Sequence, residues 1–368
     1  MIPDETQLPP SSAISVSTLA RLFDETTNSY KYLFFLALLD AIQRNLFDPA
    51  QKIPIDELTI DMLVLAWYPH VYFRLSFGKQ DKVVKALQAL TPDAVATKFN
   101  PWDKQTVREA IKSSIGAPKE LARYVPFRLL KPFLPEVSQR TGGKDHLVNQ
   151  MVRELAGIYF ADRRLPYRIT QDNELELHPT WCAYFKENYA VVTDWARWNY
   201  LLYMQRVNPL VPSLATKLFP PAQRESLFKQ AKYWREVAKH QPVSCIYSGQ
   251  LLDIESAPLD HFIPWSFVVH NEMWNLVPVS VTANSAKRDR LPARSYFKRF
   301  IELQYSALQI GRTEAQQSMM KEVENAYKHA LQLDALDDKP RFLTAYHQVL
   351  ENNLLLAEVN GFEPNWKF

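Results

Sequence analysis

Apolar side chains recur at helical spacing over most of the chain, which indicates a mainly α protein. Between Ser17 and Gln43 they follow the period of a helix that buries one face, with a polar break at residues 24–29. The same period predicts helices over residues 56–68, 79–90, 103–114, 146–160, 181–206, 222–239, 294–309, 314–333 and 340–357. The aromatic stripe within 181–206 is typical of core packing rather than of a cofactor site.

The pattern changes within residues 243–292, where short apolar runs alternate with turns. Residues 243–254 predict a hairpin with Ser248-Gly249 at its tip. Residues 258–264 and 276–281 predict two further strands, and a short helix is expected to begin near Thr282 and to end before Pro292. The order strand, irregular loop, strand, helix predicts a small α+β core embedded in the C-terminal half of a mainly α protein.

We therefore expect two domains. Residues 1–190 are predicted to form a helical N-terminal domain that binds a substrate or a partner, and residues 191–368 a domain in which helices flank the α+β core at about 243–292. Within the first domain, residues 119–139 interleave basic and aromatic side chains around two prolines. Such a segment either lies along a phosphate backbone or forms a buried turn whose long basic side chains reach water.

Composition narrows the function classes. The 368 residues, 47% of them hydrophobic, suffice for a core in each domain, and the 8 glycines against 25 prolines argue against a nucleotide-binding sheet. A formal net charge of +3 is compatible with a nucleic-acid partner but does not by itself indicate one. Cys182 and Cys245 are too few for a disulfide scaffold. No signal pattern and no apolar run of membrane-spanning length occurs, so we expect a cytoplasmic protein with no membrane association.

Four polar residues in the α+β core carry the candidate chemistry. Asp260 offers a hard anionic oxygen to Mg²⁺ or Mn²⁺, and the adjacent His261 can accept a proton near neutral pH. Asn284 can offer a carbonyl oxygen to the same ion, and Lys287, one helical turn later, can meet a phosphate oxygen. Because neighbouring residues on a strand point to opposite faces, Asp260 and His261 converge only if the strand ends or bends there, as Pro264 favours.

These residues resemble the three elements of HNH endonucleases, the ββα-metal superfamily, in the variant whose last histidine is an asparagine. The elements are Asp260-His261, Asn275-Leu276 and Asn284-x-x-Lys287, and the spacing of positions 261, 275 and 284 is also similar. The resemblance implies that Asp260 and Asn284 ligate one Mg²⁺ or Mn²⁺ ion per site and that His261 is the general base. It also implies that Asn275 serves catalysis by bracing the loop between the strands.

The sequence departs from the family at the zinc knuckles. Many HNH nucleases carry paired Cys-x-x-Cys motifs, whereas here the first pair would be Cys245 and Ser248 and no second pair follows. We therefore expect no structural zinc, with the core held by the flanking helices instead. His270, in the same loop between the strands, is an alternative base, but it lacks an adjacent carboxylate.

A basic run follows the candidate metal ligand. Lys287, Arg288, Arg290 and Arg294 are the predicted contacts to a nucleic-acid backbone, because they lie next to Asn284. The alternative interpretation is an ordinary solvated helix face.

The resemblance implies metal-dependent hydrolysis of DNA phosphodiester bonds, with one strand nicked per site. A helical protein with such a core resembles bacterial restriction or antiphage-defence nucleases, whose N-terminal helices would dock other defence-system proteins. Two alternatives stay open. One is a catalytically silent HNH-fold module for DNA binding or assembly, and the other is an adaptor whose N-terminal helices dock a partner that brings the substrate.

Overall fold

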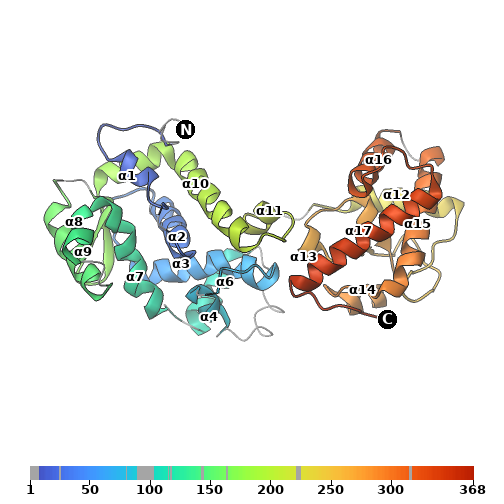
Figure 1. The fold of residues 1–368 in the computed structure, drawn as a ribbon, viewed down its shortest axis with the longest axis horizontal. Helices are drawn as coiled ribbons and strands as arrows, with labels where there is room; N and C mark the ends of the chain where they lie inside the picture. Colours follow the sequence, from blue (N-terminus) through green and yellow to red (C-terminus); the bar gives the residue numbers. More distant parts are fainter. Residues whose placement is uncertain are drawn as a thin grey trace. The chain divides into compact units, whose positions relative to one another are not determined.

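A computed structural model (Figure 1) describes residues 8–24, 26–79, 81–88, 103–114, 116, 118–141, 145–162, 165–220, 225–314 and 317–368. The chain forms two compact units, Met1–Pro209 and Leu210–Phe368. Both are mainly helical, which confirms the predicted fold class. The predicted domain boundary at residue 190 falls within the long helix α10 (Pro179–Val207), and the first unit ends just after that helix. None of the described helices is long and apolar enough to cross a membrane.

The first unit combines helices with one small sheet. Its helices are α1 (Val16–Ala20), α2 (Tyr30–Arg44), α3 (Ile55–Trp67), α4 (Lys82–Gln88), α6 (Lys104–Ser114), α7 (Lys119–Leu130), α8 (Pro135–Thr141), α9 (Asp145–Tyr159) and α10, with a π-helical turn at Tyr68–Tyr72 and a 3-10 turn at Lys131–Phe133. The antiparallel sheet has the order β1-β3-β2, from β1 (Ile53–Pro54), β2 (Tyr167–Ile169) and β3 (Glu174–Leu177).

Helix α2 is the centre of the first unit. It packs against α3, α7 and α10, and its apolar residues are buried on nearly every side. Leu33, Phe34 and Ala37, for example, are each 0% exposed. A helix that is apolar all round needs neighbours on several sides, and α3, α7 and α10 provide them.

The basic and aromatic segment at residues 119–139 is helical, which the sequence pattern did not predict. Helix α7 continues through Pro126, although proline lacks the amide hydrogen that an interior helical position normally donates. The carbonyl oxygen of Pro126 accepts a hydrogen bond from the Tyr167 hydroxyl at 2.5 Å. Phe127 is buried and Arg123 is exposed, whereas Tyr124 and Arg128 are half-buried.

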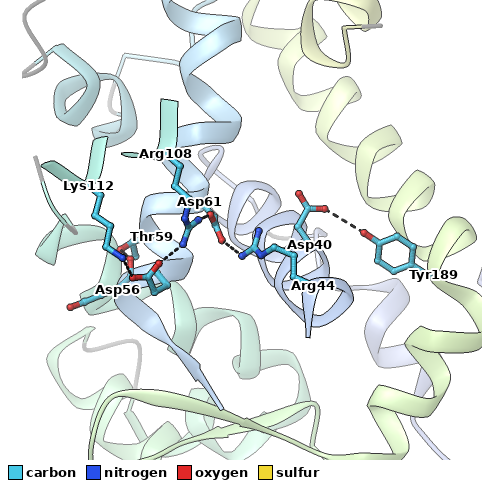
Figure 2. Close-up of polar contacts among 9 residues, drawn as sticks. Asp40, Arg44, Asp56, Thr59, Asp61, Arg108, Lys112 and Tyr189 are labelled. Carbon is cyan, nitrogen blue, oxygen red and sulfur yellow. Dashed lines mark hydrogen bonds and ion pairs between the residues drawn. The ribbon is translucent and has the colours of Figure 1, made fainter. Parts of the chain in front are cut away.

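A charge cluster joins α2, α3 and α6 (Figure 2). Figure 2 shows Arg44 and Arg108 pointing toward Asp61, which lies on α3 and is 6% exposed. Arg44 binds this carboxylate at 2.5 Å, and Arg108 contacts both Asp61 and Glu57. Lys112 donates to Glu57 at 2.6 Å, and this hydrogen bond is the main reason why the pKa of Glu57 is lowered. The buried carboxylate of Asp61 is thus the shared contact of three helices.

The second unit places the small α+β core among helices. Its elements are α11 (Leu214–Leu218), α12 (Phe228–His240), β4 (Leu259–His261), α13 (Trp265–Val268), β5 (Leu276–Pro278), α14 (Val281–Lys287), α15 (Phe297–Glu314), α16 (Gln317–Leu331) and α17 (Lys339–Val359), with 3-10 turns at Met273–Asn275 and Arg294–Tyr296. Strands β4 and β5 pair antiparallel, and α14 follows β5 directly. The predicted order of strand, loop, strand and helix is therefore present.

The hairpin predicted at residues 243–254 is reduced to a single β-bridge. Ser244 pairs with Leu251, and the amide of Cys245 donates to the carbonyl oxygen of Gln250 at 2.8 Å. Gly249 has a φ of 75°, the left-handed conformation that a tight turn uses and that favours glycine. The short helix begins one residue earlier than predicted, because the Ser280 hydroxyl caps it by accepting the amide of Ala283.

We predict that Asp61→Ala destabilises the first unit by about 3 kcal/mol, because it leaves two guanidinium groups without their shared buried carboxylate. Hydrogen exchange of the α3 and α6 segments in the full chain measures the loss. The matched control is Glu57→Ala, whose side chain is 33% exposed and whose ion pairs are therefore expected to contribute about 1 kcal/mol or less. Equal losses in the two variants would contradict the role given to Asp61.

Candidate active site

Strand β4 carries two of the predicted site residues and ends at the second of them. Asp260 is paired with Val277 and His261 with Leu276 in the antiparallel register. Asp260 is 5% exposed, whereas His261 is half-buried, so the two side chains follow the alternation of a strand. The strand ends at His261, as the nearby Pro264 predicted. Pro264 itself directly precedes the short helix α13.

The Asp260 carboxylate is held inside the core by two donors. The Tyr247 hydroxyl donates to Oδ2 at 2.8 Å, and Lys287 Nζ donates to Oδ1 at 3.1 Å. Lys287 also donates to the backbone oxygen of His261 at 2.7 Å, and its side chain is 0% exposed. Burial raises the pKa of Asp260, while the charge of Lys287 and the two hydrogen bonds oppose that rise. An ion pair thus links β4 to α14.

Lys287 does not lie where the sequence suggested. The prediction was that it meets a phosphate oxygen, but its ammonium group is enclosed and bound to Asp260 and to His261 O. A fully buried cation needs a partner inside the protein, and Asp260 provides it. Asn284 and Lys287 are three residues apart on α14, as the spacing predicted. The spacing did not indicate that the Lys287 side chain points toward β4.

Asn275 joins the two strands through its side chain. It is 0% exposed, its Oδ1 accepts the amide of Ile263 at 2.8 Å, and its Nδ2 donates to the carbonyl oxygen of Ile263 at 2.8 Å. The backbone oxygen of Asn275 also accepts the amide of Phe262 at 2.8 Å. These three bonds extend the pairing of β4 and β5 beyond the end of β4, which is the geometry that a brace requires.

His261 has a partner that the sequence did not indicate. Its Nε2 lies 3.0 Å from Oδ1 of Asn271, in the loop between the two strands. That loop is itself tied to α12, because Gln230 Nε2 donates to the backbone oxygen of Asn271 at 2.9 Å. Asn271 lies ten residues beyond His261 within an irregular loop, where no periodic pattern relates one side chain to another. Only the folded loop brings the two residues together.

His270, the alternative base, contacts other residues than His261 does. Its Nδ1 accepts the amide of Glu272 at 3.3 Å, and its ring packs against Trp274 with 5.2 Å between centroids. Burial lowers the pKa of His270, although the neighbouring Glu272 partly opposes this effect. These contacts fit a residue that shapes the loop.

The flanking helices position the loop between the strands through buried polar bonds. Gln304 of α15 donates to the carbonyl oxygen of Leu276 at 2.8 Å and accepts a hydrogen bond from Tyr327 of α16 at 2.6 Å. The Tyr346 hydroxyl of α17 donates to the carbonyl oxygen of Trp274. On the other side, Lys217 of α11 donates to the carbonyl oxygen of Phe267 at 2.6 Å. Helices α11, α15 and α17 thus bind backbone groups of β5 or of the segment between β4 and β5, and α16 holds the Gln304 side chain in place.

Asn284 is half-buried on α14, one turn before Lys287. The side-chain carbonyl of Asn284 and the carboxylate of Asp260 are both oxygen donors, the kind that suits a hard divalent cation. The described residues contain no group of three or more His, Cys, Asp and Glu side chains that could hold a metal. An ion here would depend on Asp260, Asn284, water and substrate oxygens, which is how Mg²⁺ is commonly bound. The oxygen donors fit such an ion in kind, whereas the two oxygens of the Asp260 carboxylate already accept hydrogen bonds from Tyr247 and Lys287.

The side chains of the basic run after Asn284 do not form one continuous exposed surface. Arg290 lies over the Trp366 ring at 5.7 Å and 4.0 Å from Glu363, and its guanidinium bonds to the backbone at the end of α14. Arg294 binds Glu351 at 2.8 Å and Glu358 at 3.2 Å. Among the four predicted backbone contacts, Lys287 is buried, Arg290 and Arg294 are engaged by acids, and Arg288 is exposed.

Comparison with known protein families identifies the segment that carries this site. Residues 245–293 match the family model described as HNH endonuclease. The match begins one residue after Ser244, covers both strands and α14, and confirms the resemblance seen in the sequence for these residues. The comparison with curated proteins and the comparison with solved structures returned no match.

We predict that Lys287→Ala destabilises the second unit by about 3–5 kcal/mol, because it leaves the Asp260 carboxylate buried without its cation. Urea denaturation of the full chain, followed by near-ultraviolet circular dichroism, measures the change. The control is Arg288→Ala, the next residue, which is exposed and should alter stability by no more than about 0.5 kcal/mol. If Lys287→Ala instead kept wild-type stability and only weakened salt-dependent DNA binding, the surface role would hold.

Proposed function

We propose that this chain, whose residues 245–293 match the HNH endonuclease family, is a metal-dependent nuclease that hydrolyses DNA phosphodiester bonds and nicks one strand per site. The observation that carries the proposal is the ordered set of polar residues on the two strands and the helix. His261 ends β4, the Asn275 side chain bonds to Ile263 just beyond that strand, and Asn284 lies on α14 one turn before Lys287. The family match supports nuclease chemistry in general, and the finer activity rests on these residues.

His261 is the proposed general base. Because the side-chain oxygen of Asn271 only accepts hydrogen bonds, its contact with Nε2 favours the tautomer that carries the proton on that nitrogen. A histidine fixed in one tautomer and one orientation can take a proton from water without first rearranging. Asn271 is therefore proposed as the residue that positions the base.

Asp260 and Asn284 are the proposed ligands of one Mg²⁺ or Mn²⁺ ion, which would stabilise negative charge on the phosphoryl and leaving oxygens. The Tyr247 and Lys287 donors keep the Asp260 carboxylate oriented toward α14. Arg288, exposed at the end of α14, is the member of the basic run best placed for a phosphate contact.

The proposed biological setting is defence against foreign DNA in the bacterial cytoplasm. It rests on the likeness between a helical protein with an embedded HNH core and restriction or antiphage nucleases, and it leaves the first unit to bind the substrate or a defence-system partner. The alternative, a catalytically silent HNH-fold module, is favoured by one observation: the Asp260 carboxylate is 5% exposed and already bound by two donors.

We predict that the full chain nicks supercoiled plasmid when Mg²⁺ is present and loses this activity when the ion is chelated. His261→Ala should slow nicking by about 100-fold or more, because general base catalysis typically contributes that factor, and Asn284→Ala should also reduce it. Gel electrophoresis of relaxed and supercoiled plasmid measures the rates.

The matched control for the base is His270→Ala, from the same loop, which should keep most of the activity. Equal nicking by wild type, His261→Ala and Asn284→Ala would contradict the assignment. Salt-sensitive DNA binding by the wild type without any Mg²⁺-stimulated cleavage would instead support the silent module. Repeating the assay on single-stranded DNA and on RNA identifies the substrate.

We predict that Asn271→Leu lowers kcat by at least about ten-fold with little change in KM, because His261 loses the bond that orients it. Asn271→Asp keeps an acceptor oxygen at the same position and should restore much of kcat. Steady-state kinetics on a labelled oligonucleotide duplex separates the two constants. A parallel rise in KM, or equal losses in both variants, would show that Asn271 acts on substrate binding or on stability.

A further inference from the structure

A pocket of about 490 Å³ lies against the loop that joins β4 to β5. This loop pocket is lined by loop residues and by one residue each from α11 and α12, among them Thr216, Gln230, Trp265, Val269, Asn271 and Glu272. Asn271 is also the residue whose Oδ1 lies 3.0 Å from Nε2 of His261. The loop pocket is therefore one side chain away from the proposed general base, and its volume falls within the range of small-ligand sites.

The wall that the loop contributes is fixed by hydrogen bonds to its backbone. Lys217 of α11 donates to the carbonyl oxygen of Phe267 at 2.6 Å, and Gln230 of α12 donates to that of Asn271 at 2.9 Å. Between these two bonds, Val269 has a φ of 58°, a left-handed conformation that a β-branched residue rarely adopts. The loop is thus held in a defined shape by two helices, and the pocket is present before a ligand binds.

The polar groups of the lining mainly accept hydrogen bonds. Glu225 and Glu272 contribute carboxylates, and no lysine or arginine occurs among the described residues of the lining. Burial lowers the pKa of His270, which also lines the pocket, so its ring carries no positive charge at neutral pH. Within the described part of the chain, the buried Oε1 atom of Gln230 accepts no hydrogen bond. Such a lining disfavours a phosphate group and favours a ligand that donates hydrogen bonds.

Glu272 is held in position for this role. One of its carboxylate oxygens, Oε2, accepts a hydrogen bond from the indole N–H of Trp274. A carboxylate has about four lone-pair sites, so this bond orients the group without using up its capacity as an acceptor.

Trp265 gives the lining an aromatic surface. It follows Pro264 directly at the start of α13, and its side chain is half-buried. Enzymes that act on nucleic acids read an unpaired base by stacking it on such side chains and by hydrogen bonds to its polar edge. A glutamate, in particular, can accept a hydrogen bond from the amine of cytosine. The ligand that fits is planar and donates hydrogen bonds, as a nucleobase with an exocyclic amine does.

We propose that the loop pocket binds one unpaired nucleobase with an exocyclic amine, next to the phosphodiester bond that is cleaved. Adenine, cytosine and guanine carry such an amine, whereas thymine does not. The inference rests on the proposed function, because the base is taken from the strand on which His261 would act. A paired base cannot enter the pocket, so single-stranded or locally opened DNA is the favoured substrate. A base that fills the pocket contacts Asn271, the residue that positions His261.

The test measures equilibrium binding to the full chain without divalent metal, so that no strand is cut. The probes are labelled oligothymidylates of about twelve nucleotides, within the length of a single-strand binding site, and their central residue is thymidine, deoxycytidine or deoxyadenosine. The wild type should bind the two amine-bearing probes roughly ten-fold more tightly than the thymidine probe, because only their amines match the acceptors of the lining. Fluorescence anisotropy measures the affinities.

Two variants test the residues of the pocket. Glu272→Leu should abolish the preference for an amine and leave binding of the thymidine probe nearly unchanged, because it removes an acceptor. Trp265→Leu should weaken binding of the amine-bearing probes by about ten-fold, because it removes the stacking surface. The matched control is Glu302→Leu, which removes an exposed acid of α15 outside the lining and should keep the preference. Circular dichroism checks that each variant is folded.

Failure of every probe to bind, equal affinity of the wild type for all three, or a preference that survives in both pocket variants would overturn the proposal. The readout is independent of cleavage. A chain that nicks plasmid with Mg²⁺ but shows no preference among the probes contradicts base recognition and leaves the nuclease intact. A preference for the amine-bearing probes without cleavage under any condition supports base recognition and contradicts only the nuclease.

Discussion

The buried ion pair between Asp260 and Lys287 is the contact on which the candidate site depends. It connects the strand that ends in His261 to the helix that carries Asn284. Neither charge can be left alone in an environment with so little water, so each fixes the position of the other. The Tyr247 hydroxyl and the backbone oxygen of His261 complete the hydrogen bonding. The relative position of β4 and α14 is therefore set by polar bonds as well as by packing.

Helices from the rest of the second unit provide the support for this small core. Phe262, next to His261, stacks on Phe300 of α15 with 4.0 Å between ring centroids. The C-terminal residues add a further connection, because the backbone of Trp366 pairs with Leu291 and Ala293 just after α14. Two short strands and a two-turn helix bury too little surface to be stable alone. The flanking helices supply the missing apolar contact and at the same time orient the loop that holds Asn271.

The basic run beside the HNH segment is largely neutralised, which the net charge of +3 does not show. Arg290 and Arg294 interact with acids of the C-terminal region. Cations that are close together in sequence therefore bind acids that lie far along the chain.

The sequence alone determined most of the helices and the order of the elements in the HNH segment. Helical periodicity predicted α3, α6, α10, α15, α16 and α17 close to their observed bounds, because each has a continuous apolar face. The spacing of the three HNH elements located the two strands and α14, since a turn, a strand pair and a capped helix are local features. Helix α7 was not predicted, because a proline such as Pro126 is a strong local signal against a helix.

Tertiary structure decided where the polar side chains point. Lys287 turns inward because Asp260 needs a buried partner, and Asn271 reaches His261 because α12 and the loop place it there. Arg294 is drawn to α17 by two glutamates far along the chain. Each of these contacts joins residues that no local pattern relates, and its energy depends on burial and on distant neighbours. Residue types were enough to predict the chemistry of the candidate site. The arrangement of its side chains could be known only from the tertiary structure.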